Sequence, residues 1–133
     1  MLFSLASKRM NLAEPVEVLE DGEQAIEHLS GKGKYSDRLE HPLPDMIFLD
    51  IKMPKRNGFE VLEWLRNKSN LPHIPVVMCT ASDYEMDVEK AYKMGANAYL
   101  VKPTNINALT ENLRASTEFW LKHNHPDTGH LAA

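Results

Sequence analysis

The sequence predicts an α/β domain: a doubly wound parallel sheet with helices on both faces. Three short apolar runs carry the prediction, at 46–49, 75–79 and 98–101. The first is apolar at every position, as a strand covered by helices on both faces must be. Segments with helical spacing of apolar residues lie between these runs, and strands that alternate with helices in this way form parallel sheets with right-handed crossovers.

The part of the chain before the first of these runs is predicted to hold two helices and an edge strand. Apolar residues within 2–10 share one helical stripe, and 16–20 partly alternates, which suits a strand near a sheet edge. A second helix is predicted at 23–29, with a glycine-containing breaker behind it. Residues 30–44 form a long polar connection to the strand at 46–49.

Three further helices follow the interior strands. One begins near Phe59 after the Asn-Gly pair, and another spans about 84–94. Residues 81–83 offer side chains that could cap the second of these, and Gly95 ends it where a left-handed conformation is least costly. Asn105 is suited to cap a long final helix. The apolar stripe of that helix is expected to consist of Leu109, Leu113, Phe119, Trp120 and Leu121.

Composition narrows the class of protein. The 133 residues suit one domain, which we place at 1–123, with a flexible tail at 124–133. The formal net charge is -4 and no stripe of Lys and Arg stands out, so we expect no binding to nucleic acid. The only cysteine, Cys79, lies in a predicted strand, which excludes a disulfide framework. No apolar run approaches the roughly 18 residues that span a bilayer, so we expect a cytoplasmic protein without membrane contact.

A reactive side chain ends each interior strand: Asp50, Thr80 and Lys102. The carboxyl ends of parallel strands share one edge, where open α/β sheets bind their ligands. An acid, a hydroxyl and an ammonium group are therefore predicted to converge there. Taken singly, each has an ordinary structural explanation as a cap, a strand end or a solvated charge.

Five short motifs carry a resemblance to a known family. They are Phe48-Leu49-Asp50-Ile51-Lys52-Met53-Pro54, Asn57-Gly58, Thr80-Ala81-Ser82, Gly95-Ala96 and Tyr99-Leu100-Val101-Lys102-Pro103. From about residue 2 to 123 the chain resembles the receiver domain of two-component response regulators. The long linker before Asp50 and the pair Phe119-Trp120 are similar to small stand-alone receivers that serve phytochrome-like histidine kinases. The resemblance implies a flavodoxin-like fold.

The chain departs from the family pattern at its start. Receivers begin with a buried strand followed by an acidic pair, whereas this chain begins at the helix after them. We therefore expect four strands, with the position beside 46–49 filled by a shift of 16–20 or by another chain, such as a second copy in a homodimer. Poor stability in isolation is expected, because buried backbone groups would lack partners.

The resemblance implies a function in phosphoryl transfer. Asp50 would accept a phosphoryl group from a sensor histidine kinase or a phosphotransfer protein, with Lys102 and Thr80 contacting the phosphoryl oxygens. Mg²⁺ would bind Asp50 and the backbone carbonyl of Lys52, at a site weakened without the acidic pair. Thr80 and Tyr99 would act as the switch that a downstream protein partner reads.

Two structural expectations accompany this function. In receivers the bond corresponding to Lys102–Pro103 is cis. The six histidines are scattered without metal-ligand spacing and are expected at the surface or in loops. They are His28, His41, His73, His123, His125 and His130.

The leading interpretation is a signalling protein that is not an enzyme, and three alternatives to it stay open. A pseudo-receiver, acting as an interaction module without phosphorylation, is favoured by the absent acidic pair. A hydrolase with an aspartyl-phosphate intermediate, such as the haloacid dehalogenases, has a second Asp where Lys52 stands here. A flavin-binding protein would need a phosphate-binding loop after the first strand, and none is seen.

Overall fold

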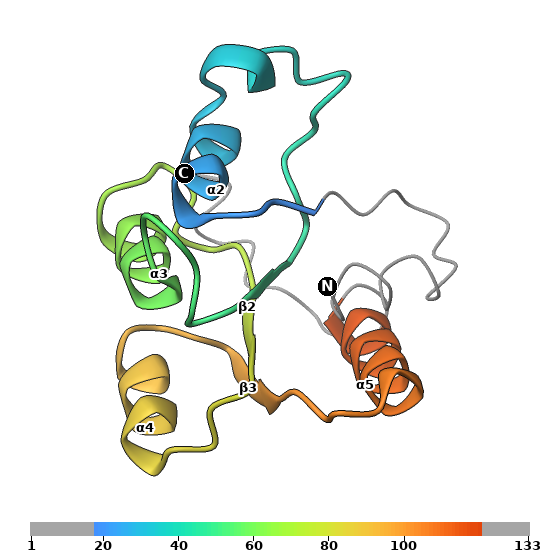
Figure 1. Cartoon of the computed structure of the whole chain (residues 1–133). Helices are drawn as coiled ribbons and strands as arrows, with labels where there is room; N and C mark the ends of the chain where they lie inside the picture. The colour runs from blue at the N-terminus through green and yellow to red at the C-terminus, as the bar shows by residue number, and fades with distance from the viewer. Residues whose placement is uncertain (1–17, 121–133) are drawn as a thin grey trace.

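The computed structural model describes residues 18–120, and Figure 1 shows their arrangement. Five helical segments and three strands make up this part of the chain. In chain order they are α2 (Gly22–Ser30), the short 3₁₀ helix η1 (Gly33–Tyr35), β1 (Ile47–Leu49), α3 (Gly58–Asn67), β2 (Val76–Thr80), α4 (Glu85–Lys93), β3 (Ala98–Val101) and α5 (Ile106–Glu118).

The three strands form one parallel sheet in the order β1-β2-β3. Ile47 lies opposite Val76 in the first pair, and Thr80 lies opposite Val101 in the second. Every residue of the central strand β2 is buried, as the uninterrupted apolar run predicts. The expected parallel α/β architecture is thus confirmed.

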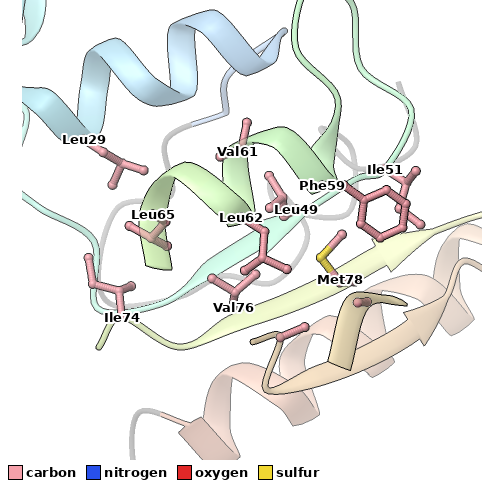
Figure 2. Close-up of a cluster of buried hydrophobic side chains, with 12 residues drawn as sticks. Leu29, Leu49, Ile51, Phe59, Val61, Leu62, Leu65, Ile74, Val76 and Met78 are labelled. Carbon is pink, nitrogen blue, oxygen red and sulfur yellow. The ribbon is translucent and has the colours of Figure 1, made fainter. Parts of the chain in front are cut away.

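Side chains of the sheet alternate between two apolar clusters. Met78 belongs to a large cluster with α2, α3 and α4, shown in Figure 2, where Leu62 and Leu65 of α3 lie over the sheet. Its neighbour Cys79 packs instead with Leu109 and Leu113 of α5 on the opposite side. Helices therefore cover both faces of the sheet, as predicted.

Side-chain caps begin three of the helices. Asp21 accepts a hydrogen bond from Gln24 N at 2.8 Å at the start of α2, and Asn105 caps α5 as predicted. Asn57 forms a reciprocal capping box with Glu60 at the start of α3. The expectation that residues 81–83 cap α4 is wrong, because Tyr84 takes the cap position and makes no capping side-chain bond.

The amino-terminal expectations are tested only in part. The helix at 2–10 and the tail at 124–133 lie outside the described residues. Of the edge strand expected at 16–20, residues 18–20 are described, and they pair with no strand. The described residues thus show three strands instead of four.

The polar connection contains a small buried core that the sequence did not indicate. Its 3₁₀ turn η1 places Tyr35 in the interior, 1% exposed. The ring of Tyr35 lies 5.0 Å from that of His28 and 5.1 Å from that of His41. The expectation that His28 lies at the surface is therefore wrong: this residue is buried on α2.

Two further observations concern the described residues. Their peptide bonds are all trans, so the expectation of a cis bond between Lys102 and Pro103 is wrong. Within 18–120, no helix has the length and apolar character required to cross a bilayer.

Candidate functional site

The three reactive residues predicted from the sequence lie at one edge of the sheet. Asp50 directly follows β1, Thr80 ends β2 and Lys102 directly follows β3. Lys102 Nζ lies 2.7 Å from Asp50 Oδ2, and the two side chains are 19% and 29% exposed. The backbone N–H of Lys102 donates to the carbonyl of Thr80 at 2.7 Å, which places these two residues side by side.

The loop between β1 and α3 holds Asp50 in position through a close backbone contact. Gly58 N donates to Ile51 O at 2.9 Å, and a Cβ atom added to Gly58 would lie 2.2 Å from Asp50 O. No side chain fits there without displacement of the backbone. The Asn57-Gly58 motif therefore has a local physical reason: Asn57 caps α3, and glycine allows the helix start to lie against the acidic residue.

Both carboxylate oxygens of Asp50 have partners. Oδ2 binds Lys102, and Oδ1 accepts a hydrogen bond from Lys52 N at 3.2 Å. The side chain of Lys52 is exposed. Asp50 is therefore an oriented carboxylate beside a cation, at a rim that solvent reaches.

Cys79 directly precedes Thr80 in β2, and its buried thiol is expected to be unreactive. Burial raises the pKa of its thiol to about 11, an effect opposed by Lys102 and reinforced by Asp50. The thiol is uncharged near neutral pH, so it is no nucleophile there. Its role as a buried apolar residue agrees with its place in the cluster with α5.

Tyr99 and Thr80, the two predicted switch residues, meet at Ser82. The Tyr99 hydroxyl donates to Ser82 O at 2.8 Å, and Ser82 N donates to Thr80 Oγ1 at 3.4 Å. Burial raises the pKa of Tyr99, and the carboxylates of Asp87, Asp50 and Asp83 reinforce this effect. The sequence indicated Ser82 as one of the candidate caps of the following helix, but not as the residue that joins Thr80 to Tyr99.

The start of α2 contacts the same loop, which sequence reasoning missed. Asp21 is buried and its Oδ2 lies 3.7 Å from Lys55 Nζ. A Cβ atom on Gly22 would lie 2.1 Å from Arg56 O, so helix and loop are in direct backbone contact. The Asp-Gly pair was the available signal, but it predicts only a turn.

For a metal ion, this part of the chain offers a partial set of oxygen ligands. Within 18–120, no three His, Cys, Asp or Glu side chains come together as metal ligands. The Asp50 carboxylate and the backbone carbonyl of Lys52 remain as hard oxygen donors of the type that Mg²⁺ prefers. These donors suit a hard cation whose other ligands are water and phosphate oxygens.

Comparison with known proteins supplies the family. The response regulator receiver domain family matches residues 6–114. Response regulator Rcp1 of Synechocystis sp. is 36% identical over 105 residues, which span 79% of this chain and 69% of that protein.

Solved structures agree with this match. A response regulator in red light signalling of R. palustris, RPA3017, has a TM-score of 0.84 at 30% identity, covering 96% of this chain and 89% of that one. The phosphorylated cyanobacterial phytochrome response regulator RcpA has a TM-score of 0.82 at 30% identity, covering 94% and 87%. The Mn²⁺-bound form of Rcp1 has a TM-score of 0.79 at 30% identity, covering 93% and 90%.

The family match extends over most of the chain, and the described sheet edge carries the acidic, hydroxyl and basic residues on which the sequence resemblance rested. The chain belongs to the receiver domain family of two-component response regulators.

Proposed function

We propose that Asp50 accepts a phosphoryl group from the phosphohistidine of a sensor histidine kinase or a phosphotransfer protein. The observation that carries the proposal is the 2.7 Å contact between Asp50 and Lys102, beside the buried Thr80 at the carboxyl ends of the strands. A carboxylate held next to an ammonium group is suited to a transfer in which negative charge must be neutralised.

The transfer needs no proton from Asp50. A carboxylate oxygen attacks phosphorus, the P–N bond to the donor imidazole breaks, and the departing nitrogen keeps the electron pair of that bond. Lys102 then contacts the phosphoryl oxygens, and the Thr80 hydroxyl donates a hydrogen bond to another of them. What the protein contributes to this reaction is the positioning of the carboxylate and the stabilisation of negative charge on the transferring group, and the described geometry supports both roles.

A divalent cation, by preference Mg²⁺, would bind Asp50 and the carbonyl of Lys52. When bound it neutralises charge on the transferring phosphoryl group. The related Rcp1 has a Mn²⁺-bound form. Uptake of the phosphoryl group by this chain is therefore expected to stop when the divalent cation is removed with a chelator.

We further propose that Thr80 and Tyr99 signal the phosphorylated state to a downstream protein. Both bind Ser82, so movement of Thr80 toward a phosphoryl group would disturb the partner of Tyr99. Local charge events that shift such a two-state element are a general means of signalling.

The experiment is incubation with a small phosphodonor and Mg²⁺, followed by intact mass. A fraction of the parent chains is expected to gain one phosphoryl group, because the metal site in the described residues is only partial, and Asp50→Asn is expected to gain none. Asp45→Asn is the matched control, because Asp45 is exposed and lies one strand-length before Asp50. Uptake by Asp50→Asn equal to that of the parent chain would refute the assignment.

A pseudo-receiver is the second candidate. The observation in its favour is that the described rim carries only part of a metal-binding set, with no three acidic or other ligating side chains grouped within 18–120. Absence of phosphoryl uptake by the parent chain in the same experiment would favour this alternative, in which partner binding is independent of phosphorylation.

A further inference from the structure

Ser82 is the centre of a hydrogen-bond network between the site and α4. Its N–H donates to Thr80 Oγ1 at 3.4 Å, and its carbonyl accepts from the Tyr99 hydroxyl at 2.8 Å. Its own hydroxyl donates to Asp87 Oδ2 at 2.8 Å and accepts from Tyr84 N at 3.3 Å. One residue therefore joins both switch residues to the first turn of a helix.

The bond to Asp87 is the strongest anchor in this network. It joins a hydroxyl to a carboxylate, and such charge-assisted bonds are about twice as strong as neutral ones. By contrast, the 3.4 Å bond to Thr80 is longer than the roughly 2.7–3.2 Å usual for N–H···O hydrogen bonds, so it is weak. Ser82 is thus held firmly from the side of α4 and weakly from the side of Thr80.

The first turn of α4 depends on Ser82 as well. The helix has no side-chain bond from its own cap residue, Tyr84. The Ser82 hydroxyl instead accepts from Tyr84 N, while Asp87 contributes a negative charge near the helix start. Ser82 therefore has two bonds to the helix start: its hydroxyl donates to Asp87 and accepts from the backbone N–H of Tyr84.

We propose that Asp87 is a positioning residue which, by fixing Ser82, orients the Tyr99 hydroxyl and couples Thr80 to the first turn of α4. The regulatory part of this inference rests on the proposed phosphorylation of Asp50, whereas the positioning part does not. If Thr80 moves toward a phosphoryl group, its weak bond to Ser82 breaks first. The loop that remains attached to Asp87 then transmits the change to α4.

The test of positioning uses the unphosphorylated full chain. Amide hydrogen exchange is measured at Ser82 and Tyr84, together with the carbon-13 signal of the Tyr99 ring carbon that bears the hydroxyl, assigned with Tyr99→Phe. Asp87→Ala and Ser82→Ala each remove the hydrogen bond from the Ser82 hydroxyl to the Asp87 carboxylate, so each is expected to speed exchange at residues 82 and 84 by about ten-fold or more and to shift the Tyr99 signal. The double variant is expected to add little to either single change.

Matched variants separate the hydrogen bond from charge and from folding. Asp83→Asn removes a charge from the same loop that also acts on Tyr99, and it is expected to leave exchange at the parent value. Ser82→Thr keeps a hydroxyl and is expected to restore slow exchange and the parent Tyr99 signal. Amide signals of α3 and α5 serve as the check that each variant folds.

The outcomes are distinct. Parent-like exchange and an unshifted Tyr99 signal in Asp87→Ala would overturn the proposal, as would an equal effect of Asp83→Asn. In a second arm, phosphorylated protein is examined at the α4 amides, where Asp87→Ala is expected to lose at least half of the shift seen in the parent. If neither the parent chain nor any variant gains a phosphoryl group, the proposed function is refuted. The experiment on the unphosphorylated chain still decides whether Asp87 positions Ser82.

Discussion

Gly58 illustrates how one residue type determines the geometry of the site. The amino terminus of α3 lies so close to the backbone of Asp50 that a Cβ atom would overlap its carbonyl oxygen. The same contact orients the loop in which Lys52 N donates to the Asp50 carboxylate. Packing and site chemistry therefore impose the same requirement at this position.

Gly58→Ala is predicted to lower the free energy of unfolding by about 3 kcal/mol, because the methyl group displaces backbone on both sides of the contact. Gly33→Ala is the control. Gly33 has a φ of 57° but open space around its Cβ position, so only the left-handed backbone cost of about 1 kcal/mol applies. Urea denaturation measures both, and equal losses would contradict the steric explanation.

Cys79 provides a prediction about pH. Since burial raises the pKa of the thiol to about 11, at least about a hundred-fold less thiolate is present at pH 8 than for an ordinary cysteine. Iodoacetamide is expected to react slowly with the native protein, and faster as the pH rises toward 11. The same reaction in denaturant is expected to proceed at the rate of a free thiol. Rapid alkylation of the native chain at pH 8 would show that Cys79 is accessible and ionised.

At the scale of elements, the helix starts differ in how they are held. The capping box of Asn57 and Glu60 satisfies two backbone donors of α3, whereas the cap residue of α4, Tyr84, satisfies none with its side chain. Asn57→Ala is predicted to cost about 1 kcal/mol of stability. Tyr84→Ala is predicted to change stability by less than half as much, because no capping bond is lost. Thermal denaturation checks the pair, and a larger loss for Tyr84→Ala would contradict the prediction.

The same contrast shows what sequence reasoning could find. The cap Asn105, the interior strands and the edge shared by Asp50, Thr80 and Lys102 follow from local residue types, periodicity and spacing, so they could be predicted. The burial of His28 and the 3₁₀ turn that places Tyr35 in the interior could not, because they depend on contacts between α2 and a distant loop. The bond from Tyr99 to Ser82 could not be predicted either, because it joins β3 to the loop after β2, and the two residues are 17 positions apart.

At the scale of the whole molecule, the residues at the carboxyl ends of the strands form the candidate site, whereas contacts at the amino ends stabilise the fold. The carboxyl ends carry Asp50, Thr80 and Lys102, while the amino ends are held together by Arg66 of α3. The guanidinium group donates to four acceptors in the loops that precede β2 and β3. They are Gly95 O at 2.9 Å, Pro72 O at 2.8 Å, Ile74 O at 2.7 Å and Asn97 Oδ1 at 2.8 Å.

This division predicts that stability and site geometry can be changed separately. Arg66→Lys keeps the positive charge but replaces a planar fork of donors by one ammonium group, which cannot reach all four acceptors together. Because carbonyls in partly buried positions then lose their partners, the free energy of unfolding is predicted to fall by about 2 kcal/mol.

Arg56→Lys is the matched control: its ion pair with Glu23 is exposed, and such pairs contribute about 0 to 1 kcal/mol. Chemical denaturation should separate the two variants, while the ring signal of Tyr99 in Arg66→Lys should match the parent well below the unfolding transition. A shifted Tyr99 signal in the folded variant would mean that the two ends of the sheet are coupled, contrary to the separation argued from the contacts of Arg66.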